Sequence, residues 1–278
     1  MAPLVRFSAA LLGTNLVGYA TRSADSVIVG RFLGAGALGY YSMAIQLMLY
    51  PLQQVSSVFV RVLFPTLVQI KDDLPRLRAA YLKAVASIAL VTFPIMGGLF
   101  ALADDFVLVV FGPQWVEMAP VLKVLAWVGM GQSVGTTVGT IYMSTGTVGI
   151  ALRVTLIAAP VLIVAMVAGL PWGIFGVAVG YAIATFALFY YTAVTAFRVI
   201  ALRLADFHRV LVRPLVATLV MVGVLLAAAP SMQLLAPALR LALGIALGVL
   251  TYGAASMAVN RAQLTEVVSI VRSLRHKP

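Results

Sequence analysis

Cysteine is absent from the 278 residues, and histidine occurs only twice. A chain without cysteine has no disulfide bonds, no thiolate nucleophile and no cysteine-ligated metal site. Both histidines, His208 and His276, lie in basic stretches away from acidic clusters. The phosphate-binding pattern GxxxxGK[ST] and the dinucleotide fingerprint are missing as well. We therefore expect no metal site and no cofactor.

Charge is also scarce, because only 10% of the residues are charged while 63% are hydrophobic. A soluble domain is about half apolar and about a quarter charged. A chain this apolar cannot cover a water-facing surface, so the composition predicts an integral membrane protein. The net charge of +11 could suggest nucleic acid, but we attribute it to basic cytoplasmic loops and to attraction by anionic membrane lipids.

Long apolar segments are what the sequence has in abundance. A helix needs about 20 apolar residues to cross a bilayer, and the ten-residue alternation of a membrane barrel is absent. We predict an all-α polytopic membrane protein with about eight transmembrane helices. The segments are 8–30, 37–60, 81–103, 118–143, 150–170, 174–196, 212–230 and 237–259. The first one runs on without a cleavage site, so no cleavable signal peptide is expected.

The basic residues predict the orientation of these helices. With the N-terminus inside, the inner segments hold all of the 19 Lys and Arg residues except Arg22, Arg31, Lys123 and Arg240. This bias predicts that both termini are cytoplasmic. The outer connection between the third and fourth helices then carries Asp104, Asp105 and Glu117.

Two segments have the pattern of helices that lie at a membrane surface. Residues 71–85 mix charge with Leu and Tyr and predict a short amphipathic helix ahead of the third span. Residues 261–278 place apolar side chains opposite arginines at helical spacing, which predicts a basic amphipathic tail on the inner leaflet. A solvated basic tail is the alternative. Glycines spaced by four, in 131–139 and 176–180, indicate close helix packing.

The first span contains a polar stripe within apolar sequence. Asn15, Tyr19, Arg22 and Ser26 fall on one helix face, and Asp25 lies beside it. An arginine in hydrocarbon costs at least ~2.5–3.5 kcal/mol on insertion scales, so it persists where it faces protein or water. Three explanations remain open: a salt bridge with Asp25 that locks two helices, a charged group lining a cavity, or a side chain that snorkels to the surface.

Two further stripes favour a cavity. Gln46, Tyr50, Gln53, Ser57 and Arg61 repeat along the second span, where Pro51 predicts a bend. A milder stripe in the fourth span comprises Gln132, Ser133, Thr136, Thr137 and Thr140. An arginine suits phosphate oxygens, and the amides and hydroxyls suit sugars. The candidate cavity residues are therefore Arg22, Asp25, Asn15, Tyr19, Gln46 and Gln53. No carboxylate pair or activated nucleophile is placed for catalysis, so we do not expect an enzyme.

The stretch TNLVGYATRSADSVIVGRFLGAGALGYYSMAIQLMLYPLQQVSSVFVRVLFPTL resembles the start of the C-terminal lobe of Wzx-type polysaccharide flippases. These belong to the multidrug/oligosaccharidyl-lipid/polysaccharide exporter superfamily, and the colanic acid exporter branch is the most similar. IVGRFLG, ALGYYSMA and VLFP carry the likeness together, and FPIMGGLFALADDFVLVVFGPQW extends it. The eight helices then resemble helices 7–14 of such a flippase. Residues 1–200 would form the C-terminal six-helix lobe, 201–260 two additional helices and 261–278 the cytoplasmic tail.

The resemblance implies a function that composition does not show. Such proteins move undecaprenyl-pyrophosphate-linked oligosaccharide across the bacterial inner membrane by alternating access between two lobes. The expected partners are therefore the lipid-linked oligosaccharide, membrane lipids, and either the missing N-terminal lobe or a second copy, with no nucleic acid. We expect the chain to be a fragment that lacks the first lobe. The alternatives are a cation-coupled small-molecule antiporter of the superfamily, a non-transporting membrane partner subunit, and a membrane glycosyltransferase.

Overall fold

The computed structural model describes residues 2–70 and 72–259, apart from the side chains of residues 2–7, 22, 56–63 and 66. The amphipathic tail predicted for 261–278 lies outside the described residues. The described chain is helical throughout and contains no strand. In order it contains α1 (Ala2–Leu33), α2 (Ala35–Gln69), α3 (Leu74–Ala101), α4 (Ala103–Val110), η1 (Pro113–Trp115), α5 (Met118–Gly135), α6 (Val138–Ser144), α7 (Val148–Gly169), η2 (Leu170–Trp172), α8 (Gly173–Val199), α9 (Leu204–Ala228), η3 (Ala229–Met232) and α10 (Pro237–Val259).

Each of the eight predicted segments corresponds to helix in the structure, but one of them is broken, and the predicted surface helix at 71–85 is not separate. The segment predicted for 118–143 is broken after Gly135 into α5 and α6. At the break the Thr136 and Thr137 hydroxyls donate to backbone carbonyls three residues back, which competes with regular helix geometry. The short amphipathic helix expected at 71–85 is instead the beginning of α3, which Asp73 caps by accepting from the Arg76 amide.

Membrane-spanning length and apolarity are found in four stretches of the described chain. These are Leu74–Ala101, Val148–Val199, Leu204–Met232 and Pro237–Val259. The second stretch has 52 residues and contains both α7 and α8, so it is long enough for two crossings of about 20 residues each. The chain is thus a multi-pass α-helical membrane protein. The helices α1 and α2, which carry the polar stripes, fall outside these four stretches.

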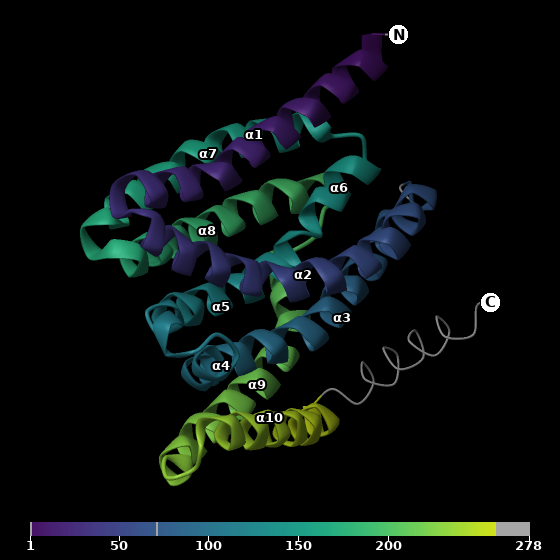
Figure 1. Ribbon diagram of the computed structural model, residues 1–278. Coiled ribbons are helices and arrows are strands. Elements are labelled where there is room, and N and C mark those ends of the chain that lie inside the picture. The colour runs from purple at the N-terminus through teal and green to yellow at the C-terminus, as the bar shows by residue number, and fades with distance from the viewer. Residues whose placement is uncertain (1, 71, 260–278) are drawn as a thin grey trace, which may run out of the picture.

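The helices form a bundle in which α1, α7 and α8 lie on one side and α3, α9 and α10 on the other (Figure 1). Between the two sides, α2 and α5 fill the middle. The core is built from the inner faces of α2, α3, α5 and α8, where Tyr41, Met48, Leu122 and Val177 are fully buried. Because α9 packs on α3 and α10 packs on α9 and α4, the last two helices extend this bundle. The domain division at residue 200 stays a prediction.

The α7–α8 hairpin depends on glycine at its contact surface. A Cβ atom added to Gly176 would lie 2.2 Å from the Gly169 carbonyl oxygen, and one added to Gly180 would lie 2.2 Å from the Ala165 carbonyl oxygen. The two backbones therefore touch at these positions, as small residues spaced by four permit. The packing role predicted for Gly176 and Gly180 is confirmed.

We expect Gly180→Ala to destabilise the protein by ~1–3 kcal/mol, because the added methyl group must push two helix backbones apart. The matched control is Gly223→Ala in α9, where an added Cβ meets nothing within 4 Å and helix propensity favours alanine. The measurement is the thermal unfolding midpoint of both variants in detergent. An unchanged midpoint for Gly180→Ala would show that the close contact does not limit stability.

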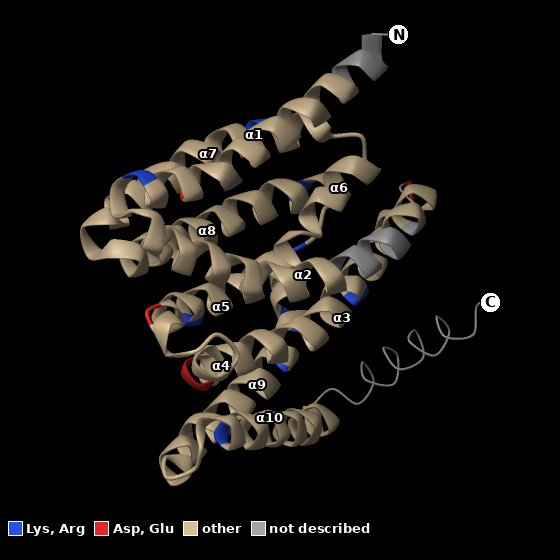
Figure 2. Cartoon of the chain, viewed as in Figure 1, with Lys and Arg blue, Asp and Glu red and all other residues tan. Residues whose placement is uncertain are grey.

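Acidic and basic residues lie together at the α4 end of the bundle (Figure 2). At the α4 end, Lys123 pairs with Asp104 at 2.6 Å and Arg240 pairs with Asp105 at 2.5 Å. These contacts tie α4 to α5 and to α10, and they bring together four residues that the sequence predicted on one side of the membrane. At the opposite end Arg78 donates to the Ala201 carbonyl oxygen at 3.1 Å, linking α3 to the α8–α9 turn.

Candidate functional site

The candidate site begins with an exposed face of α1. Asn15 is exposed, and 69% of Tyr19 is exposed. Leu12 and Leu16 lie on the same face and are more than half exposed, so the face is mixed apolar and polar. The opposite side of α1 packs against α7, with the Gly13 Cα next to Leu152. This α1 face therefore has no neighbour within the described bundle.

A second exposed face lies on α2. Gln46 and Gln53 are exposed, and Tyr50 between them is 69% exposed. The buried side of the same helix packs on α3 and α5 through Tyr41, Met48 and Leu52. Both Gln46 and Gln53 thus offer amide donors and acceptors at the bundle surface, as Asn15 does on α1. Such groups can form hydrogen bonds with hydroxyl-rich molecules.

Asp25 does not share this exposed surface. Only 8% of it is exposed, and its carboxylate accepts from the backbone amide and hydroxyl of Ser26. It lies close enough to Tyr41 of α2 to interact with it electrostatically, as does Tyr181 of α8. The Tyr41 hydroxyl is buried and has no hydrogen-bond partner among the described residues. The structure therefore places Asp25 in a polar cluster inside the bundle, apart from Asn15, Tyr19, Gln46 and Gln53.

Arg22 lies in α1, three residues after Tyr19 and three before Asp25. Its side chain falls outside the described part of the chain. The three explanations for Arg22, which are a cavity-lining charge, a salt bridge with Asp25 and a side chain that snorkels to the surface, stay predictions.

The third polar stripe is part of the core. Ser133 and Thr137 are fully buried. The Thr92 hydroxyl of α3 donates to Ser133 at 2.9 Å, and Thr137 donates to the Tyr81 hydroxyl at 3.1 Å. Thr140 is also buried and bonds to the Thr137 carbonyl oxygen. The prediction that these three residues line a cavity is wrong, because their buried hydroxyls are satisfied by hydrogen bonds to a neighbouring helix or to the nearby backbone.

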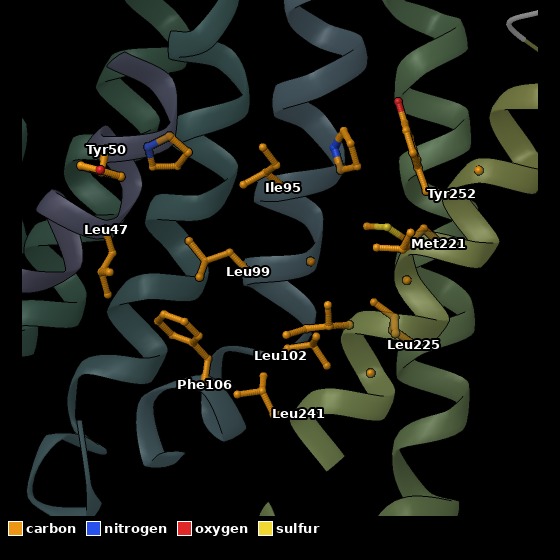
Figure 3. Close-up of a pocket in the computed structure, with 18 residues that line it drawn as sticks. Leu47, Tyr50, Ile95, Leu99, Leu102, Phe106, Met221, Leu225, Leu241 and Tyr252 are labelled. Atoms are coloured by element: carbon orange, nitrogen blue, oxygen red, sulfur yellow. The ribbon is translucent and has the colours of Figure 1, made fainter. Parts of the chain in front are cut away.

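An apolar groove is the feature that sequence reasoning missed. It has a volume of about 750 Å³ and lies over α3, between α2 on one side and α9 and α10 on the other (Figure 3). Ile95 and Leu99 lie along α3 and Leu102 follows its last residue. Leu47 and Tyr50 come from α2, and Leu241 and Tyr252 come from α10, all labelled in Figure 3. A groove lined in this way can hold a hydrocarbon chain but offers few polar contacts.

The groove adjoins the exposed polar face through α2. Tyr50 belongs to both, since it lines the groove and stands between Gln46 and Gln53 in sequence. One sequence feature at the groove is the spacing of Gly244 and Gly248 on α10. Glycine leaves space at a helix surface, but the same pattern also occurs in tight helix contacts. The arrangement offers adjacent polar and apolar surfaces to an amphipathic ligand.

Comparison with known proteins finds similarity to polysaccharide biosynthesis proteins over part of the chain. The family model described as "Polysaccharide biosynthesis protein" matches residues 1–120. Lipopolysaccharide biosynthesis protein WzxC of Escherichia coli (strain K12) is 32% identical over 182 residues, which cover 65% of this chain and 37% of that protein. Succinoglycan biosynthesis transport protein ExoT of Rhizobium meliloti (strain 1021) is 37% identical over 123 residues, which cover 44% of this chain and 25% of that protein.

The solved structure of the lipid II flippase MurJ in an inward closed conformation has a similar fold. The TM-score is 0.71, the sequence identity is 18%, and the match covers 90% of this chain and 53% of that flippase. At a sequence identity of 18%, the match shows a shared fold and nothing further. The chain spans about half of the flippase and a quarter to two fifths of the curated relatives named above.

Proposed function

We propose that this chain, a relative of polysaccharide biosynthesis proteins with the fold of a flippase half, takes part in flipping a lipid-linked oligosaccharide. The substrate we propose is an undecaprenyl-pyrophosphate-linked oligosaccharide, moved across the bacterial inner membrane for surface or exopolysaccharide biosynthesis. The observation that carries the proposal is the sequence similarity to WzxC over 65% of this chain, together with the MurJ-like fold over 90% of it. The relatives' names describe biosynthesis and transport, which supports a role without catalysis.

The exposed faces of α1 and α2 supply groups for the polar part of this substrate. Arg22 would pair with phosphate oxygens, because its guanidinium fork matches their geometry. Asn15, Tyr19, Gln46 and Gln53 would bond sugar hydroxyls. The apolar groove beside Tyr50 would hold part of the hydrocarbon chain. Burial of hydrocarbon there gains little over the bilayer, so the groove would orient the substrate more than it would strengthen binding.

This chain supplies only one wall of such a site. Asn15, Tyr19, Gln46 and Gln53 are exposed in the described bundle, and polar groups that face lipid are costly. A flippase site at a repeat interface is closed by a second repeat. The proposed partner is therefore an N-terminal lobe of the same family or a second copy of this chain.

We propose that both termini are cytoplasmic and that the α4 end faces the periplasm. The grouping of Asp104, Asp105, Lys123 and Arg240 at one end of the bundle supports a common side for them, and the basic bias supports the direction. Alkaline phosphatase fused after residue 110 should be active, and the same reporter after residue 278 should be inactive. Activity at residue 278 would reverse the proposed orientation.

Deletion of the gene tests the proposed function in the native host. We expect surface or secreted polysaccharide to fall to background and the lipid-linked oligosaccharide to accumulate, because assembly continues while translocation stops. The measurements are polysaccharide quantification and chromatography of the lipid-linked pool, with the gene restored on a plasmid as the control. Normal polysaccharide in the deletion strain, with no accumulated intermediate, would contradict the proposal.

A further inference from the structure

A cluster of arginines marks the end of the bundle opposite α4. Arg198 lies in the last turn of α8, Arg203 precedes α9, and Arg209 and Arg213 follow on α9; all four are exposed. In the sequence, Asp206 is the only acidic residue between Glu117 and Glu266. The site proposed above uses none of these residues.

These arginines differ from the basic residues at the α4 end. There, Lys123 and Arg240 each form a salt bridge with an aspartate. None of the four arginines forms a salt bridge with any residue that the structure describes. Arg78 of α3 adds a further positive charge here, because it donates to the Ala201 carbonyl oxygen in the turn between α8 and α9. The α8–α9 end therefore presents positive charge that its own described surroundings do not neutralise.

The surface around Arg209 and Arg213 is layered like a membrane interface. The two arginines are four residues apart and share one face of α9. Val212, Val216, Leu219 and Val220 continue this exposed face toward the middle of the helix. Beside them, the half-exposed Tyr190 ring of α8 stacks on His208 with centroids 5.9 Å apart. Tyrosine is enriched at headgroup depth in membranes, so the arginines lie where phosphates are found and the valines and leucine where acyl chains are found.

We propose that the surface formed by Arg209, Arg213, Tyr190 and the exposed apolar face of α9 is a binding site for an anionic phospholipid. The guanidinium groups donate to the lipid phosphate, the tyrosine ring packs at the glycerol level, and the acyl chains cover Val216, Leu219 and Val220. Arg198 and Arg203 add long-range attraction. A zwitterionic lipid gains less, because its own cation opposes the arginines. The site is separate from the α2–α3–α10 groove, which holds no basic residue.

The test uses the full chain released from vesicles of equimolar phosphatidylglycerol and phosphatidylcholine, with retained lipids counted by native mass spectrometry. We expect the chain to retain phosphatidylglycerol preferentially. Arg209→Gln/Arg213→Gln should lower this preference at least about tenfold, since each arginine near an anionic surface contributes roughly fivefold. Arg209→Lys/Arg213→Lys should retain most of it, because the charge survives.

The matched control is Arg31→Gln/Arg153→Gln, which removes two exposed arginines elsewhere and should lower the preference clearly less than Arg209→Gln/Arg213→Gln does. Inorganic phosphate added at the same concentration should not displace the lipid. Displacement of the lipid by phosphate would show that the arginines bind simple anions and not specifically a phospholipid. Equal retention of both lipids by the unaltered chain, or equal losses in the two Gln double variants, would overturn the proposal. The readout does not involve flipping, so it is independent of the proposed transport function.

Discussion

The purified 278-residue chain, reconstituted alone as a monomer, is expected to insert into vesicles but not to flip a lipid-linked sugar. Its polar α1 and α2 faces are exposed, so the substrate would have one protein wall and lipid on the other side. Alternating access needs two repeats that rock around a shared site. With one repeat there is no closed cavity to open toward either side of the membrane.

Addition of a family N-terminal lobe should restore flipping from background to a protein-dependent rate. The measurement is the loss of access of a fluorescent sugar label to a membrane-impermeant quencher, with and without the second lobe. An unrelated six-helix membrane protein is the control for non-specific leakage. Flipping by a strictly monomeric chain would contradict the prediction. Flipping by a homodimer alone would identify the second wall as another copy.

The second large effect is expected at Arg22. In the paired, two-lobe context, Arg22→Ala should reduce polysaccharide export to background while the protein still accumulates, because the proposed cavity would lose the charge that we assign to phosphate binding. Arg22→Lys should retain some export, since a lysine keeps the charge but lacks the bidentate fork. Arg31→Ala is the control, because Arg31 is an exposed arginine in the last turn of the same helix and should be tolerated.

A structural salt bridge gives a different pattern for the same variants. If Arg22 serves only to neutralise the buried Asp25, Arg22→Ala leaves an uncompensated buried carboxylate, which costs ~3–5 kcal/mol. The protein would then fail to accumulate, and Arg22→Ala/Asp25→Asn would recover it. Normal polysaccharide export by the Arg22→Ala variant would show that Arg22 does not bind the ligand.

The sequence alone determined the class of the protein and the course of its backbone. The scarcity of charge required a lipid environment, and the lengths of the apolar runs located the eight long helices. The glycine spacing also predicted a close helix contact at Gly176 and Gly180, and the structure shows that the partner is α7. The motif IVGRFLG with its neighbours indicated the flippase relatives. These properties follow from composition, length and short spacing, which are visible without knowing which helices are neighbours.

Which face of each helix is buried was decided by the tertiary structure. Helical spacing correctly grouped Asn15 with Tyr19 and Gln46 with Gln53, and these residues are exposed. The same reasoning failed for Ser133 and Thr137, which bond to Thr92 and Tyr81 across helix contacts. A hydroxyl can line a cavity or satisfy a neighbouring helix, and spacing alone does not distinguish the two.

The groove and the inward position of Asp25 also depend on partners that are distant in sequence. Asp25 is buried where α1 packs on α2, close to Tyr41. The groove exists because α10 stands away from α2 across α3. Helix periodicity specifies which residues share a face. The identity of the neighbouring helix, fixed by packing across the whole bundle, determines whether that face becomes core, groove or exposed surface.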